Sequence, residues 1–102
     1  MNYEETLVEW SKKAYGNEPK RKIADIIVYE AADCLRDCIR LEDYPQDKEL
    51  YTKLLGVSLG DVLAMSQLLC SMAQLDFAKV YNDGCQRAIE RCKEKLEGRS
   101  GF

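Results

Sequence analysis

The chain has 102 residues, 46% of them hydrophobic and 32% charged, a composition typical of one globular domain with a single core. Its formal charge of −3 argues against a nucleic-acid backbone as partner. The sequence contains no histidine, which excludes Ser-His-Asp and Cys-His catalysis as well as imidazole metal sites.

The spacing of apolar residues predicts an amphipathic helix over residues 2–15. Glutamates in its first half and lysines in its second half suit the helix dipole. Gly16 and Asn17 should end it. Pro19 fits the first position of a second helix, which we expect to run to about Asp43.

The second helix carries acidic residues on its core-facing side. Glu30 falls inside the apolar stripe, Asp33 shares that face, and Asp37 follows a turn later. Charged side chains are almost never buried without a partner. One interpretation is that Glu30 and Asp33 pair with Arg36, Arg40 or another basic residue.

Residues 44–47 should form a turn, and a short helix over 48–55 should end at Gly56. The next stretch, residues 57–75, is apolar around most of a helix circumference, so we expect a helix buried on nearly all sides. A membrane span is the competing interpretation. Three serines, two glutamines and Asp61 make the stretch too polar for that.

Asp61 is the only charge in this central helix. A local explanation is a capping box, with Ser58 as N-cap and Asp61 three residues later. Capping alone would not require the neighbours at helical spacing, Met65 and Leu68, to be apolar. A last helix should start after a cap at Asp76 and run over residues 77–97.

These elements predict an all-α, antiparallel four-helix bundle with one extra short helix. We expect a single domain over residues 1–102, with an N-terminal helix and turn (1–18), core helices (19–97) and a tail (98–102).

The five cysteines, with no CxxC pair and no secretion signal, indicate reduced thiols in a cytoplasmic protein. Four of them, Cys34, Cys38, Cys85 and Cys92, form two pairs within helices. Structural zinc sites usually take a close pair from a tight turn, so we interpret these cysteines as small core residues. The basic residues 20–22 should form a solvated helix end.

The acidic residues are the more specific feature. If the second and central helices face each other, Glu30, Asp33 and Asp61 converge, and their repulsion favours a bound cation. Oxygen ligands without histidine or cysteine select Mg²⁺ or Mn²⁺. Such an ion would neutralise a phosphate chain and orient a water for attack.

Two segments resemble the MazG-like, all-α nucleoside triphosphate pyrophosphohydrolases. Residues 29–35, YEAADCL, are similar to their EExxE segment, and residues 58–63, SLGDVL, to their ExxD segment. In that family four acidic residues from two helices bind Mg²⁺. Carried over, Glu30, Asp33 and Asp61 match, whereas Tyr29 and Ser58 stand where the family has glutamate. The resemblance covers roughly residues 3–95.

The resemblance implies Mg²⁺- or Mn²⁺-dependent hydrolysis of a ribo- or deoxyribonucleoside triphosphate to the monophosphate and pyrophosphate, in a homodimer or higher oligomer. Glu30, Asp33 and Asp61 would be catalytic metal ligands, with Ser58 lining the site. Further substrate-binding candidates are Trp10 and Tyr15 for stacking on a base, Asn82, and Arg87 or Arg91. The alternatives are a catalytically inactive nucleotide- or protein-binding module, suggested by the serine at position 58, and a structural helical-bundle interaction protein.

Overall fold

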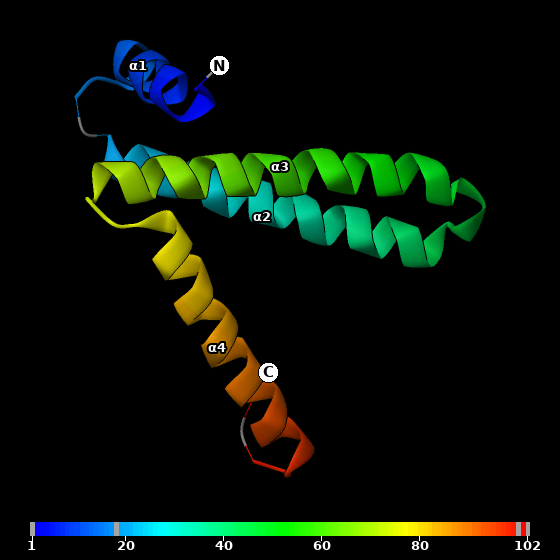
Figure 1. Cartoon of the computed structure of the whole chain (residues 1–102). Coiled ribbons are helices and arrows are strands. Elements are labelled where there is room, and N and C mark those ends of the chain that lie inside the picture. Colours follow the sequence, from blue (N-terminus) through cyan, green and yellow to red (C-terminus); the bar gives the residue numbers. More distant parts are fainter. Residues whose placement is uncertain (1, 18, 100, 102) are drawn as a thin grey trace.

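The computed structural model describes residues 2–17, 19–99 and 101, and all regular structure in this part of the chain is helical. The prediction of an all-α protein is therefore confirmed. The α-helices are α1 (Tyr3–Tyr15), α2 (Lys20–Asp43), α3 (Lys48–Met72) and α4 (Phe77–Leu96), with a short 3₁₀ turn, η1 (Pro45–Asp47), between α2 and α3 (Figure 1).

The ends of α1 follow from local chemistry. The Asn2 side chain accepts a hydrogen bond from the Glu5 backbone N–H at 3.1 Å, which satisfies one of the free donors at the helix start. At the other end Gly16 has φ of 88°, a conformation that glycine adopts without steric cost, and its N–H bonds to the Lys12 carbonyl. The predicted start and stop of this helix are confirmed.

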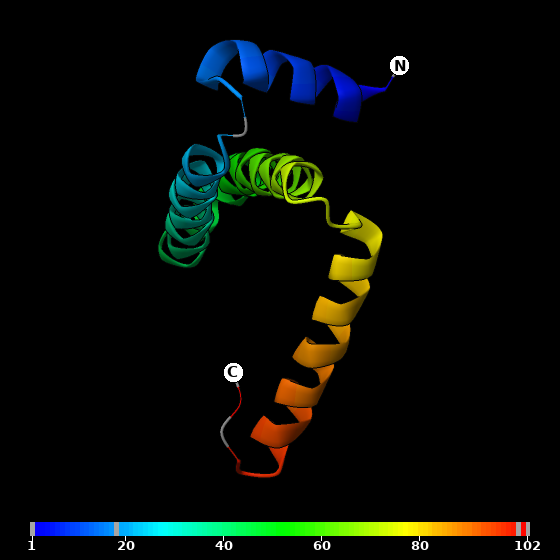
Figure 2. The ribbon, with the colours of Figure 1, turned by 90° about the vertical axis from the view of Figure 1, so that its left-hand side faces the viewer.

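Helices α2 and α3 form an antiparallel hairpin and lie side by side along their lengths (Figures 1 and 2). The chain reverses through η1, as the turn predicted at residues 44–47 requires. The fully buried apolar side chains are Ile23 on α2 and Leu68 on α3. Helix α1 lies across the end of the hairpin where α2 begins and α3 ends (Figure 1).

Helix α3 corrects the prediction of two separate helices. It runs without a break through Gly56 to Met72, so residues 48–55 are its first turns and not a short helix of their own. A glycine inside a helix costs only about 1 kcal/mol relative to alanine, and packing against α2 outweighs that. The helix also ends at Met72, three residues before the predicted end at Leu75, and the chain then turns through Gln74, which has φ of 59°.

The expected burial of the central helix is a second correction. Only Ser58, Leu68 and Cys70 of α3 are buried in the single chain, while Val57 and Leu63 are more than half exposed. The prediction assumed that the other helices surround α3. Helix α2 covers one side of it, and α1 covers only one end.

Helix α4 projects away from the hairpin (Figures 1 and 2). It begins after Asp76, whose side chain accepts from the Lys79 backbone N–H at 3.2 Å, so the predicted cap is confirmed. It ends at Leu96, close to the predicted end. No residue of α4 is buried.

The segment Pro45–Met72 is long and apolar enough to cross a membrane, judged by length and composition alone, with a mean hydropathy of 1.5. Core helices of soluble proteins pass the same test. Here α2 lies along α3, and nearly half of its residues are charged. A hydrocarbon environment around α3 would therefore also strip water from the charges of α2, at a high free-energy cost.

Candidate acidic site between helices α2 and α3

Glu30 and Asp61 meet across the hairpin. Glu30 lies one turn after Ile26 on the face of α2 that packs against α3, and Asp61 projects from the facing part of α3. The two carboxyl groups are close enough for Asp61 to raise the pKa of Glu30, through repulsion and a hydrogen bond. The predicted convergence of these two residues is thus present in the structure.

The environment favours the protonated form of Glu30. Burial raises the pKa of its carboxyl group above the ordinary value, and repulsion by Asp61 and Asp33 and the hydrogen bond to Asp61 raise it further. The nearby Arg36 acts in the opposite direction. Two carboxylates in contact are relieved either by a shared proton or by a cation between them.

Asp33 is close to this pair but is held by an arginine. Its Oδ1 lies 3.2 Å from Nη1 of Arg36, and both side chains are nearly half exposed. This is the pairing with Arg36 that the sequence offered as an alternative for Asp33. Within the described residues, no group of three or more Asp, Glu, Cys or His side chains is placed to hold a metal ion as it stands.

The carboxyl groups of Glu30 and Asp61 have the chemistry that suits Mg²⁺. Mg²⁺ commonly keeps several of its waters and is bound through one or two carboxylates together with substrate phosphates. The pair of Glu30 and Asp61 meets that requirement, and Asp33 would add a third oxygen donor on leaving Arg36.

The prediction that Ser58 caps the start of a helix is wrong. It lies in the middle of α3, so it is not an N-cap, and its Oγ donates a hydrogen bond to Oδ2 of Asp37 at 3.0 Å. Asp37 is fully buried, and its Oδ1 lies 3.3 Å from Nε of Arg36. The Ser58 hydroxyl is therefore engaged within the helix–helix contact.

Asp37 is a buried residue of the hairpin that was not among the predicted site residues. Its position, seven residues after Glu30 and four after Asp33, places it on the same face of α2. That spacing was a visible signal for a buried carboxylate at the contact with α3. The serine at position 58 gave no matching signal, because serine is also common at helix starts.

Beside the acidic pair, α1 closes an apolar pocket of about 220 Å³. Trp10 and Tyr15 form part of its wall, and Trp10 is 61% exposed, so it is not the core anchor that tryptophan often is. The pocket is lined by Leu7, Trp10, Ser11, Ala14, Tyr15, Ile23, Met65 and Leu68. Met65 lies one helical turn after Asp61, so the pocket and the acidic pair are neighbours along the hairpin.

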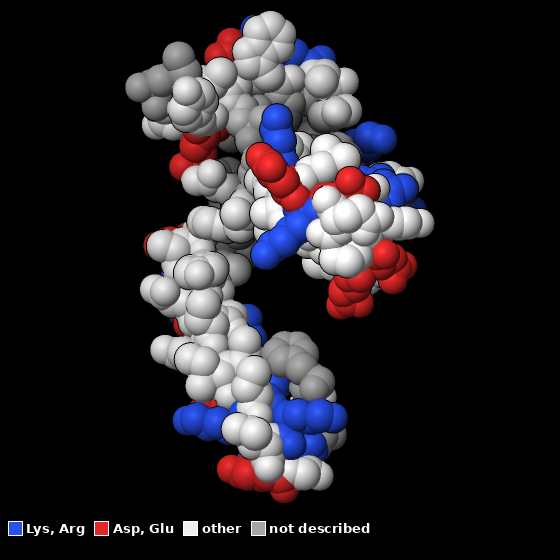
Figure 3. Space-filling view, turned by 90° about the vertical axis from the view of Figure 1, so that its right-hand side faces the viewer, with Lys and Arg blue, Asp and Glu red and all other residues white. Residues whose placement is uncertain are grey.

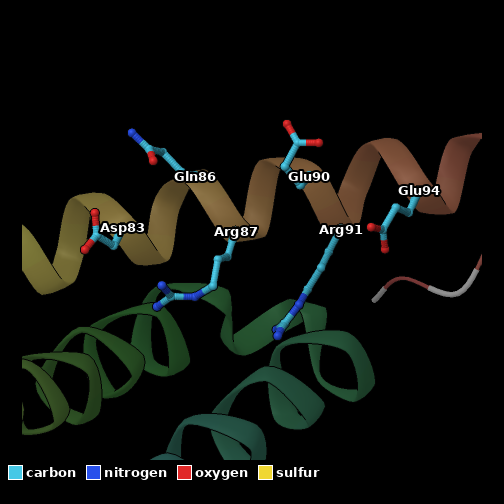
Figure 4. Close-up of a pocket in the computed structure, with 6 residues that line it drawn as sticks. All are labelled: Asp83, Gln86, Arg87, Glu90, Arg91 and Glu94. Atoms are coloured by element: carbon cyan, nitrogen blue, oxygen red, sulfur yellow. The ribbon is translucent and has the colours of Figure 1, made fainter.

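The candidates on α4 are not part of this arrangement. Arg87 and Arg91 project to the same side of α4, while Gln86 and Glu90 point elsewhere (Figure 4). The hollow of about 480 Å³ that they line is formed by α4 residues alone. Asn82 is an exposed residue of the same helix. The pocket beside Trp10 and the hollow on α4 are therefore separate features.

Charges of both signs are interspersed on the hairpin (Figure 3). The hairpin seen there has no continuous basic surface, whereas Lys and Arg side chains gather at the C-terminal end of α4.

Fold and site together define an all-α protein with a carboxylate pair at the contact between two antiparallel helices. Comparisons with known protein families, with curated proteins and with solved structures found no match. The similarity to the MazG-like enzymes therefore depends on the two short segments at residues 29–35 and 58–63.

Proposed function

We propose that this chain is a metal-dependent nucleoside triphosphate pyrophosphohydrolase of the MazG-like type. The observation that supports the proposal is the contact between Glu30 and Asp61, with the pKa of Glu30 raised by burial and by its acidic neighbours. A divalent cation would relieve that repulsion and would at the same time attract a phosphate chain.

Glu30 and Asp61 would hold Mg²⁺ or Mn²⁺, with Asp33 as a further ligand. When bound, the ion would neutralise phosphate charge and activate a water. In the proposed reaction the water oxygen bonds to the α-phosphorus and the α–β anhydride bond breaks. The products are the nucleoside monophosphate and pyrophosphate. Ser58 would act indirectly, since its hydroxyl holds Asp37 and not the ion.

The pocket beside Trp10 and Tyr15 would take the base. An aromatic wall offers stacking to any base, and one helical turn of about 5.4 Å separates Asp61 from Met65 in the pocket lining. A nucleotide with its base between α1 and α3 would therefore have its phosphates near the acidic pair. We propose no role in binding for Asn82, Arg87 or Arg91 within the same chain, because α4 leaves the hairpin.

The test is an assay of pyrophosphate and monophosphate with a panel of ribo- and deoxyribonucleoside triphosphates and either Mg²⁺ or Mn²⁺. We expect turnover of at least one nucleotide, and its loss in Asp61→Asn and Glu30→Gln. Asp43→Asn is the matched control, since this exposed residue lies at the far end of α2. Absence of turnover by the wild-type protein with every nucleotide would rule the enzyme out.

A second candidate is a catalytically inactive nucleotide-binding module of the same fold. The observation that favours it is the engagement of the site by the chain's own groups, namely Asp33 by Arg36 and Ser58 by Asp37. A rise in melting temperature with nucleotide and Mg²⁺, without turnover, would select this function. A chain that responds to neither ligand would instead be a structural or partner-binding protein.

A further inference from the structure

Arg36 contacts two acidic side chains of α2 with different parts of its guanidinium group. Its Nη1 lies 3.2 Å from Oδ1 of Asp33, and its Nε lies 3.3 Å from Oδ1 of Asp37. The side chains of Arg36 and Asp33 are 47% and 41% exposed, whereas the side chain of Asp37 is fully buried. The two ion pairs of this one arginine therefore lie in different surroundings.

These surroundings decide which of the two ion pairs can be exchanged. The pair with Asp33 contributes little to stability, because water and salt screen charges that are half exposed. The pair with Asp37 is hard to break, because its loss would leave a buried carboxylate without its cation. Asp37 is also held from α3 by the Ser58 hydroxyl at 3.0 Å. The guanidinium group is thus anchored at Nε, whereas Nη1 is able to change its partner.

Arg36 lies beside the acidic pair of the proposed active site. Asp33 comes about one turn after Glu30 and about one turn before Arg36, so the three side chains follow one another along α2. Burial, Asp61 and Asp33 raise the pKa of Glu30, and Arg36 is the cation that lowers it. A phosphate group at the acidic pair would therefore have the Arg36 guanidinium as a positively charged neighbour within the hairpin.

We propose that Arg36 is the phosphate-binding residue of this site, with Nη1 exchanging Asp33 for a phosphate oxygen while Nε stays on Asp37. This inference rests on the proposed function, because the phosphate is that of the nucleotide. A divalent ion offsets only part of the charge of a triphosphate, and a guanidinium group binds phosphate oxygens through N–H groups in a fixed plane. The same exchange releases the Asp33 carboxylate for Mg²⁺ or Mn²⁺.

The test compares two affinities by isothermal titration calorimetry, that of Mn²⁺ alone and that of inorganic pyrophosphate in the presence of Mg²⁺. Arg36→Gln should bind pyrophosphate about 10-fold more weakly than wild type or worse, because a charge-assisted contact is lost. The same variant should bind Mn²⁺ more tightly than wild type, because Asp33 no longer has a competing cation. A substitution that only loosened the hairpin would weaken both affinities.

Arg40→Gln is the matched control. It removes the same charge one turn further along α2, where the guanidinium group lies 6.0 Å from the centre of the Tyr51 ring and not at the acidic pair. Both affinities of this variant should stay near those of wild type. Circular dichroism reports whether each variant remains helical.

A second variant keeps the buried contact of Arg36 with Asp37 and serves where Arg36→Gln does not fold. Asp33→Asn removes the exposed partner of Nη1, so in the presence of a metal chelator it should bind pyrophosphate more tightly than wild type. Asp43→Asn makes the same change at the far end of α2 and should not.

The outcomes separate this inference from the proposed function. A wild-type protein that binds both probes, with the same pyrophosphate affinity in a helical Arg36→Gln, would overturn the role of Arg36 and leave the proposed function standing. A parallel loss of both affinities in that variant would also overturn it, because Arg36 would then only hold the hairpin together. A wild-type protein that binds neither probe would overturn the proposed function and this inference with it.

Discussion

Asp37 is a fully buried carboxylate, and the groups that contact it explain why the hairpin tolerates it. The Ser58 hydroxyl donates to one oxygen, and Nε of Arg36 lies 3.3 Å from the other. A buried carboxylate without such partners costs several kcal/mol. The contact also links α2 to α3 one to two turns from Glu30 and Asp61, so it helps to fix the alignment that brings these two residues together.

Removal of the Ser58 hydroxyl tests this contact. Ser58→Ala leaves one buried oxygen of Asp37 without its donor, and we expect the free energy of unfolding to fall by about 1–3 kcal/mol. Ser66→Ala is the control, because the Ser66 hydroxyl bonds only to the Val62 carbonyl of its own helix. Urea denaturation of both variants gives the comparison. An equal loss of stability in the two variants would contradict this expectation, because the hydrogen bond between α2 and α3 would then contribute no more than one within a single helix.

Glu30 predicts a pH dependence for the metal-free protein. Because its pKa is raised in the folded state by burial and then by Asp61 and Asp33, the folded chain holds this proton more tightly than the unfolded chain does. The resulting stabilisation is present below the ordinary value of 4.5 and is lost as the pH rises through the raised pKa. As the pH rises through the raised pKa of Glu30, the free energy of unfolding of Glu30→Gln should therefore increase relative to that of wild type.

Urea denaturation in the presence of a chelator, repeated across this pH range, measures the effect. Asp61→Asn should weaken the same pH dependence, because Asp61 is the largest source of repulsion on Glu30. A wild-type stability curve parallel to that of Glu30→Gln would show that the contact between the two carboxyl groups does not exist in solution.

At the scale of the elements, α3 shows how packing overrides a local stop signal. A glycine followed by a new apolar run favours a helix end at Gly56, yet the helix continues. A Cβ built at Gly56 would have no other atom within 4 Å, so the position is an ordinary exposed helix site. At Gly16 the backbone φ of 88° is one that only glycine adopts easily.

Alanine substitution should therefore have opposite effects at the two glycines. Gly56→Ala should raise the free energy of unfolding by about 0.5–1 kcal/mol, because it removes backbone entropy from the unfolded chain. Gly16→Ala should lower it, because alanine is strained at positive φ. Thermal unfolding of both variants measures this. Stabilisation by Gly16→Ala would contradict the conformation at the end of α1.

At the scale of the whole molecule, the single chain is an open arrangement of a hairpin, one covering helix and one projecting helix (Figure 1). Among the described residues, the fully or nearly fully buried apolar side chains are only Ile23, Leu68 and Cys70. That is a small core for a protein with 46% hydrophobic residues. Much of the hydrophobic stabilisation available to the sequence is realised only when the remaining apolar faces are covered.

Much of the helical structure was determined by the sequence itself. Caps at Asn2 and Asp76, the glycine at position 16 and the turn around Pro45 act locally, so the starts of α1 and α4 and the reversal after α2 were predictable. The facing of Glu30 and Asp61 was also foreseeable, because helical spacing places each on the face that a two-helix hairpin brings together.

The tertiary structure alone decided the rest. Whether Gly56 breaks a helix depends on the free energy of packing along α2, which no local pattern contains. The pairing of Ser58 with Asp37 depends on the alignment of two helices whose residues are distant in sequence. The exposure of α3 was unpredictable for the same reason. Apolar spacing says which face seeks burial, but only the direction in which α4 leaves α3 determines whether its own chain can provide it.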